Sequence, residues 1–189
     1  MAGDTINRFD KKMKKLIHYR LGVNRQFPAT HLRKGEETKF IEKMKFILNC
    51  TICPFVKSAK DCLKFDCTVY KGVGIKRNTI RANYFLWAKR FEKIDRGEAV
   101  LELFYWSGKP YNSKQVVFAT LTKDDGIGIQ RLDFGRENIM YPLVGMSIFV
   151  MPGDIANNDG LSFGDWKAWF RNYDLSKPLA IIHFTKFRY

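Results

Sequence analysis

Long apolar runs are absent from this chain of 189 residues. No uninterrupted apolar segment approaches the roughly 20 residues that a membrane-spanning helix needs, and the first residues lack the apolar core of a signal peptide. P-loops, dinucleotide fingerprints and Gly-x-Ser-x-Gly elbows are also absent. The sequence therefore predicts a soluble cytoplasmic protein without a membrane partner, and it disfavours the common nucleotide hydrolases and the serine hydrolases.

Acidic residues are scarce relative to basic ones. The chain holds 33 Lys and Arg against 19 Asp and Glu, which gives a formal charge of +14 and a pI near 9.7. The excess is concentrated in residues 1–80, with 18 basic and 7 acidic side chains. Such a field attracts polyanions, so nucleic acid is the expected partner class, with a generic solubilising surface as the alternative.

Histidine is rare, and its three positions, His18, His31 and His183, form no metal or nucleophile set by spacing. His183 alternates with apolar neighbours in an expected strand, which points it to the opposite face from them. We therefore predict a structural histidine whose hydrogen bonds are satisfied.

Length and aromatic content predict one domain with extensions. The 16 Phe, 8 Tyr and 4 Trp residues supply a core, and the chain is short for two domains. Residues 1–25 are expected to form a basic extension, and 26–189 the domain, with a Cys-rich insert at about 49–72. Within the extension, apolar residues at helical spacing predict a short amphipathic helix. These residues are Ile6, Phe9, Met13, Leu16 and Ile17.

Short elements separated by Gly, Pro and Asn predict an α+β fold with a small barrel-like sheet. Helices are expected from about 36–38 onward and at about 84–94 and 162–171, the last capped by Ser162 with Asp165 in its first turn. Trp87, Trp166 and Trp169 lie at helical positions and are expected in the core. The expected strands are Val100–Tyr105, Gln115–Leu121, Ile127–Phe134, Met146–Met151 and Leu179–Phe187.

All four cysteines lie within one short stretch. Cys50, Cys53, Cys62 and Cys67 form a C-x2-C-x8-C-x4-C arrangement. Cytoplasmic cysteines rarely form disulfides, and two close pairs match the way thiolates hold tetrahedral zinc. A structural zinc site is predicted, with His31 as a substitute ligand. Ordinary buried thiols are the alternative.

Two polar and aromatic segments are the strongest candidates for a binding surface. They are Lys76–Tyr84 and Trp106–Gln115, which combine cations, amides, hydroxyls and aromatic rings. This mixture suits phosphate contact and base stacking. For Trp106, core packing is an equal alternative. The expected nucleic-acid contacts are Lys76, Arg77, Asn78, Arg81, Trp106, Lys109, Tyr111 and Lys114.

The segment Lys76-Arg77-Asn78-Thr79-Ile80-Arg81 resembles the K-x-x-T-I-R signature of the ASCH domain family within the PUA-like superfamily. The resemblance covers about 26–189 apart from the insert. It extends through Gln26-Phe27-Pro28-Ala29-Thr30-His31, Trp106-Ser107-Gly108-Lys109-Pro110-Tyr111 and the closing 181–189, as in small phage and Bacteroidetes proteins. It implies a pseudo-barrel of about five or six strands with packed helices and a cleft for RNA or a modified base.

One enzymatic branch of that superfamily hydrolyses the amide of N-acetylated cytidine with a Lys, a Thr and an acidic residue. The resemblance places these roles on Lys76, Thr79 and Asp159. The lysine would accept the threonine proton, the hydroxylate would attack the acetyl carbon, and the acid would protonate the leaving amine. Phosphate contact by Lys76, a strand or turn hydroxyl at Thr79 and a turn residue at Asp159 are the alternatives.

Three functions remain open from the sequence. The favoured one is binding of RNA, single-stranded DNA or a modified nucleobase in a basic cleft. The second is an amidohydrolase that acts on an acylated nucleoside. The third is a phage accessory protein in which the basic extension and the Cys-rich insert dock another protein.

Overall fold

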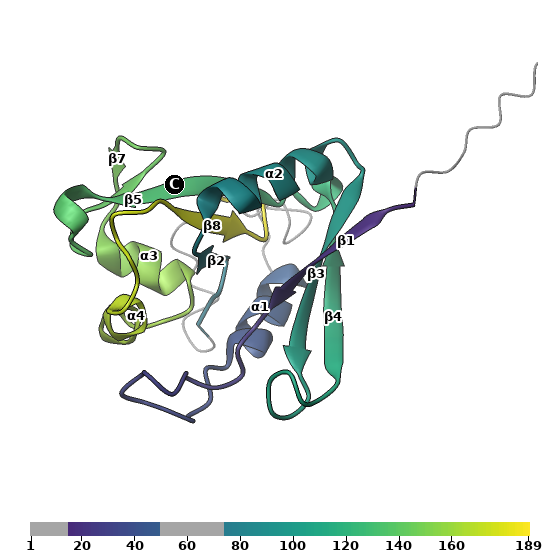
Figure 1. Cartoon of the computed structure of the whole chain (residues 1–189), viewed down its shortest axis with the longest axis horizontal. Coiled ribbons are helices and arrows are strands. Elements are labelled where there is room, and N and C mark those ends of the chain that lie inside the picture. Colours follow the sequence, from purple (N-terminus) through teal and green to yellow (C-terminus); the bar gives the residue numbers. More distant parts are fainter. Residues whose placement is uncertain (1–14, 50–73) are drawn as a thin grey trace, which may run out of the picture.

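The computed structural model describes residues 15–49 and 74–189 and shows an α+β protein with two sheets (Figure 1). The four cysteines and the apolar positions Ile6, Phe9 and Met13 of the expected N-terminal helix lie outside the described residues. Within them, eight strands and four α-helices are present, more strands than the five or six expected for a single pseudo-barrel.

The smaller sheet has three strands in the order β1-β3-β4. β1 (Ile17–Gly22) runs parallel to β3 (Ala99–Trp106), and β3 runs antiparallel to β4 (Gln115–Leu121). The helix expected in the N-terminal segment is wrong at its end, because Ile17 begins the strand β1. Leu21 of β1 is 2% exposed in the core, so the segment taken as an extension contributes to the folded body.

The larger sheet has five strands in the order β2-β8-β5-β6-β7. Its members are β2 (Asn78–Arg81), β5 (Gly128–Phe134), β6 (Pro142–Val144), β7 (Ile148–Phe149) and β8 (Leu179–His183). Every residue of β8 is buried, between β2 and β5. Two expected strands are shorter than predicted: β8 ends at His183, and only Ile148–Phe149 of 146–151 pair, because a helix begins at Pro152.

The helices connect the sheets and cover them. α1 (Phe40–Leu48) buries Phe40, Ile41, Met44 and Ile47, as its apolar spacing predicts. α2 (Tyr84–Asp95) contacts β3 of one sheet and β5 and β8 of the other. α3 (Pro152–Asn158) and α4 (Phe163–Phe170) pack together at the end of the molecule away from the three-stranded sheet (Figure 1). Short 3-10 turns occupy Lys123–Asp125 and Gly135–Glu137.

The tryptophan and capping predictions for the helices are confirmed. Trp87 and Trp166 are 7% and 0% exposed, and Trp169 is half-buried against the same core. The Ser162 hydroxyl accepts a hydrogen bond from the backbone N–H of Asp165 at 3.1 Å and so caps α4. Of the described helices, none has the length and apolar character required to cross a membrane.

Candidate functional site

A buried ion pair joins the start of β2 to the end of α3. The Lys76 ammonium donates hydrogen bonds to Oδ1 of Asp159 at 2.5 Å and to the backbone carbonyl of Asp159 at 2.6 Å. Only 3% and 6% of the two side chains are exposed. The ring of Phe40, from α1, lies 4.0 Å from the ammonium nitrogen. Three elements distant in sequence therefore enclose one cation.

Burial changes the protonation equilibria of this pair. Loss of hydration lowers the pKa of Lys76, opposed by the attraction of Asp159, and nearby Arg81 and Lys43 lower it further. Burial raises the pKa of Asp159, opposed by the charge and hydrogen bond of Lys76. The two pKa values move toward each other, which makes proton exchange between the groups easier than in water. Perturbed pairs of this kind are typical of functional sites.

Gly160 allows the close approach of the two partners. Its φ is +81°, and a Cβ atom there would lie 3.1 Å from the carbonyl oxygen of Ile75 and 3.1 Å from Cβ of Lys76. The N–H of Arg77 donates to the carbonyl of Asn158 at 2.8 Å on the other side of Asp159. The turn after α3 is thus fixed against the chain that enters β2.

A small pocket, here called the inner pocket, lies beside the ion pair. Its volume is about 20 Å³, room for about one water molecule. It is lined by Val23, Asn24, Phe40, Lys76, Thr79, Ile80, Arg81, Asp159, Leu161, Trp169 and Phe170. The structure therefore brings Lys76, Thr79 and Asp159 to one pocket. Among the described residues, the Thr79 hydroxyl makes no hydrogen bond, whereas Arg81 donates to the Gly22 carbonyl.

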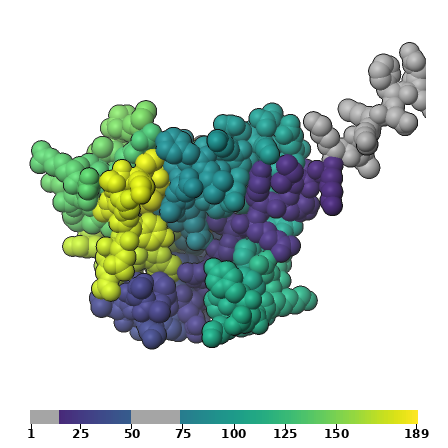
Figure 2. Space-filling view, in the orientation of Figure 1, coloured from purple at the N-terminus to yellow at the C-terminus, as the bar shows by residue number. Residues whose placement is uncertain are grey.

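A larger outer pocket of about 400 Å³ adjoins the inner pocket, and the two share Val23 and Asn24. Its walls come from the chain that follows β1 and from the turn between β3 and β4, two segments that lie together at the lower edge of Figure 2. It is lined by Val23, Asn24, Arg25, Gln26, Phe27, Pro28, Glu37, Trp106, Gly108 and Pro110. The half-buried Trp106 lies 5.4 Å from the Tyr111 ring and 5.8 Å from the Phe104 ring.

The expected nucleic-acid contacts fall into two groups. Lys76, Arg77 and Asn78 are 2%, 1% and 0% exposed, so their side chains belong to the interior and not to an exposed phosphate-binding wall. Arg81 is partly exposed and lines the inner pocket. Trp106 lines the outer pocket, and the neighbouring Lys109, Tyr111 and Lys114 are exposed on the β3–β4 turn. The exposed charge of the site therefore lies farther from β2 than the sequence suggests.

Arg25 and Phe27 line the outer pocket but are not among the nucleic-acid contacts expected from the sequence. The Arg25 guanidinium lies 5.6 Å from the Tyr105 ring and donates to the Ser107 carbonyl at 3.3 Å, so it bridges the two walls of the outer pocket. Phe27 stacks on His31 with ring centroids 4.4 Å apart. The signal that could have found Phe27 is the Gln26–His31 segment, which carries part of the resemblance described above.

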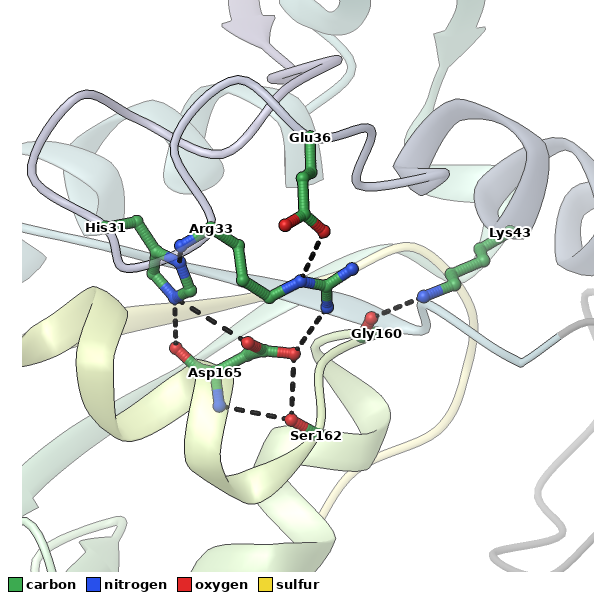
Figure 3. Close-up of polar contacts among 7 residues, drawn as sticks. All are labelled: His31, Arg33, Glu36, Lys43, Gly160, Ser162 and Asp165. Carbon is green, nitrogen blue, oxygen red and sulfur yellow. Dashed lines mark hydrogen bonds and ion pairs between the residues drawn. The ribbon is translucent and has the colours of Figure 1, made fainter.

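Behind Phe27, a polar cluster links the chain before α1 to the start of α4 (Figure 3). Arg33 donates to Oδ2 of Asp165 at 2.9 Å and to Glu36 at 2.7 Å. Nδ1 of the buried His31 accepts the N–H of Arg33, so Nε2 carries the proton that is donated to the Asp165 carbonyl at 3.0 Å. These bonds give His31 a structural role between the chain before α1 and the start of α4. Its use as a substitute zinc ligand stays a prediction, because the four cysteines lie outside the described residues.

His183 is buried, but the expectation that its hydrogen bonds are satisfied is wrong. Both ring nitrogens are without a hydrogen-bond partner in the described structure, and the ring packs against Phe187 and Tyr189, which also contact each other. Burial lowers the pKa of His183 well below its usual range, with Arg188 as a second cause. Its strand partner Asn78 donates to the Tyr189 hydroxyl at 2.9 Å.

Within 15–49 and 74–189, no group of three or more His, Cys, Asp or Glu side chains is placed to hold a metal ion. Comparison of the chain with known protein families, with curated proteins and with solved structures finds no match.

Proposed function

We propose that the outer and inner pockets form the cleft of a PUA-like fold of the ASCH type, which binds a nucleobase of RNA, single-stranded DNA or a modified nucleoside. RNA is favoured. The observation that carries the proposal is the pocket of about 400 Å³ lined by Arg25, Phe27 and Trp106. It shares Val23 and Asn24 with the inner pocket that holds the Lys76–Asp159 pair. A volume in this range is typical of small-molecule sites.

The chemistry of the outer pocket suits a base. Aromatic side chains stack on bases with little sequence preference, at about 1–3 kcal/mol per base, and the half-buried Trp106 supplies such a ring. Lys109 and Lys114 lie exposed on the same turn and would contact the backbone phosphates. The net charge of +14 adds attraction at long range.

Two further elements of this proposal rest on the sequence. The ASCH signature supports a PUA-like arrangement of the strands, and the spacing of Cys50, Cys53, Cys62 and Cys67 supports a structural zinc ion. The zinc proposal is tested by metal analysis of the purified protein, with substitution of Cys50 by Ser. If the protein contains no zinc after purification in a zinc-containing buffer, the zinc proposal is wrong.

The binding proposal is tested by fluorescence anisotropy with a labelled single-stranded RNA probe. Trp106→Ala should weaken binding at least about fivefold, because loss of one stacked base costs about 1 kcal/mol or more. Trp106→Phe should retain most of the affinity. Phe149→Ala, at an aromatic that is 51% exposed and does not line either pocket, is the matched control. The proposal is contradicted if the affinity for RNA changes neither with salt concentration nor with the Trp106→Ala substitution.

Hydrolysis of an N-acylated cytidine is a second candidate, favoured by the meeting of Lys76, Thr79 and Asp159 at the inner pocket. Burial lowers the pKa of Lys76 and raises that of Asp159, which favours transfer of a proton from the ammonium to the carboxylate. The neutral amine would then accept the threonine proton as the hydroxyl attacks the acyl carbon, and the carboxylic acid would protonate the leaving amine. Water would hydrolyse the resulting acyl-threonine ester and regenerate the hydroxyl. Because the inner pocket holds about 20 Å³, an acyl group enters only if residues that line this pocket move apart.

Hydrolysis is tested by chromatographic detection of cytidine from N4-acetylcytidine. Thr79→Val keeps the shape of the side chain and should abolish turnover if the hydroxyl is the nucleophile. Thr120→Val, at an exposed threonine of β4, is the control and should leave turnover unchanged. Turnover that persists in Thr79→Val, or none in the unmodified protein, removes this candidate and leaves the binding proposal intact.

A further inference from the structure

Lys43 of α1 is a half-buried cation without a carboxylate partner among the described residues. Its ammonium makes one hydrogen bond there, to the backbone carbonyl of Gly160 at 2.7 Å. Burial lowers the pKa of Lys43, and the nearby positive charge of Arg33 lowers it further, whereas the charges of Asp165 and Glu42 partly oppose both effects. An anion beside this ammonium would offset both effects.

The ammonium faces a hollow of about 290 Å³, here called the rim pocket, which shares Phe27 and Glu37 with the outer pocket. In Figure 3, Arg33 and Lys43 reach toward Gly160 from two different elements. The rim pocket is lined by Phe27, Arg33, Glu37, Thr38, Lys39, Lys43, Gly160, Leu161, Ser162 and Asp165. Three of these residues are cations and two are carboxylates.

The acidic groups near the rim pocket are already engaged. Oδ2 of Asp165 accepts hydrogen bonds from Arg33 and from the Ser162 hydroxyl, and Glu36 is paired with Arg33. Glu37 pairs with Lys39, but about 60% of both side chains is exposed, so this pair is easily exchanged for another partner. Within 15–49 and 74–189, Lys43 has no carboxylate partner and Lys39 is held by an exposed pair alone, so both can contact an incoming anion.

We propose that the rim pocket binds a phosphate ester of the same ligand whose base occupies the outer pocket. This inference rests on the function proposed above and sharpens it, because it identifies the ligand as a nucleotide or a nucleic-acid strand and not a free nucleoside. Lys43 supplies the central contact, and Arg33 and Lys39 add positive charge to the lining of the pocket. The shared edge at Phe27 and Glu37 lets one ligand occupy both pockets.

The first experiment uses inorganic phosphate and follows backbone amide shifts of 160–165 by nuclear magnetic resonance at constant ionic strength. We expect these shifts to saturate with phosphate and to vanish in Lys43→Gln, which removes the charge and keeps an uncharged donor on a side chain one bond shorter. Lys45→Gln, at an exposed lysine of the same helix, should behave as the unmodified protein. Shifts that persist in Lys43→Gln, or that are missing in the unmodified protein, overturn the phosphate site.

The second experiment measures the salt dependence of binding of a short single-stranded RNA. Each phosphate contact adds about 0.7 to the slope of log affinity against log salt concentration, so Lys43→Gln should lower the slope by about that amount and Lys43→Arg should not. An unchanged slope in Lys43→Gln overturns the inference. Phosphate shifts in a protein that binds no RNA contradict the proposed function alone, because the phosphate experiment needs no base.

Discussion

The Lys76 ammonium donates to both the carboxylate and the backbone carbonyl of Asp159, at 2.5 and 2.6 Å. The Lys76 side chain therefore both fixes the backbone of the turn after α3 and neutralises the Asp159 carboxylate. Because both groups are buried, neither can lose its partner without leaving an uncompensated charge in the interior.

Removal of either partner should destabilise the protein strongly. We expect Lys76→Met or Asp159→Asn alone to lower the free energy of unfolding by about 3–5 kcal/mol. The double variant should recover much of this loss, because it buries no net charge. Urea denaturation measures all three. Asp174→Asn, which breaks an exposed pair with Lys177, is the control and should have a much smaller effect.

If the two single variants and the double variant lose stability additively, Lys76 and Asp159 are not coupled. That result would contradict the ion pair as the element that holds the turn.

The free energy of unfolding should decrease as the pH is lowered, because of His183. Burial lowers the pKa of His183 in the folded protein below the ordinary value near 6.5. The unfolded chain then binds more protons than the folded one below about pH 6.5, at a cost of up to about 1.4 kcal/mol per pH unit. Stability is complete above that pH and is lost as the pH falls. His183→Phe should flatten this dependence, measured by urea denaturation across the pH range.

The unmodified protein provides the comparison for that measurement. An acid dependence that is equal in His183→Phe and in the unmodified protein shows that other groups cause it.

Gly160→Ala should be more destabilising than its backbone angle alone requires. The angle accounts for about 1 kcal/mol or more, and the new Cβ would press on the backbone of Ile75 and on Lys76 at 3.1 Å. Gly35→Ala separates the two causes, because Gly35 has a φ of +83° and open space around its Cβ position. The midpoint temperature of thermal unfolding should be clearly lower for Gly160→Ala than for Gly35→Ala. Equal losses would show that the close approach carries no cost.

Loss of the α4 cap should cost about 1 kcal/mol, the usual effect of replacing an N-terminal Ser by Ala. The variant is Ser162→Ala, which also removes a hydrogen bond to Oδ2 of Asp165. Chemical denaturation measures the loss, with Ser147→Ala in the exposed β6–β7 turn as control. An equal effect at both positions would argue against a capping role.

Local patterns account for the parts of the fold that the sequence predicts well. The apolar positions of α1 and α2 recur at helical spacing, and Ser162 with Asp165 marks the start of α4. Strands β3, β4 and β5 follow alternating or apolar segments bounded by turn residues. In each case, residues close in sequence determine the element.

The remainder depends on partners far away in the chain. β1 pairs with β3, about 80 residues later. Ile17, Tyr19 and Leu21 alternate with polar residues as in a strand, but this short pattern overlaps the helical spacing that ends at Leu16 and Ile17. Arg77 and Asn78 are charged or polar residues that the sequence places on a surface, whereas β8 and the closing residues bury them. The outer pocket is equally non-local, because Phe27 and Trp106 meet only after β1 and β3 have paired.

The central place of β8 has a consequence for the order of assembly during synthesis. β2 carries Thr79 and Arg81, and its only strand neighbour among the described residues is β8. The ribosome must therefore complete residues 179–183 before β2 can join a sheet. Until then, Lys76 and its neighbours are not fixed in the folded protein. A nascent chain should therefore become able to bind its ligand in one of the last steps of folding.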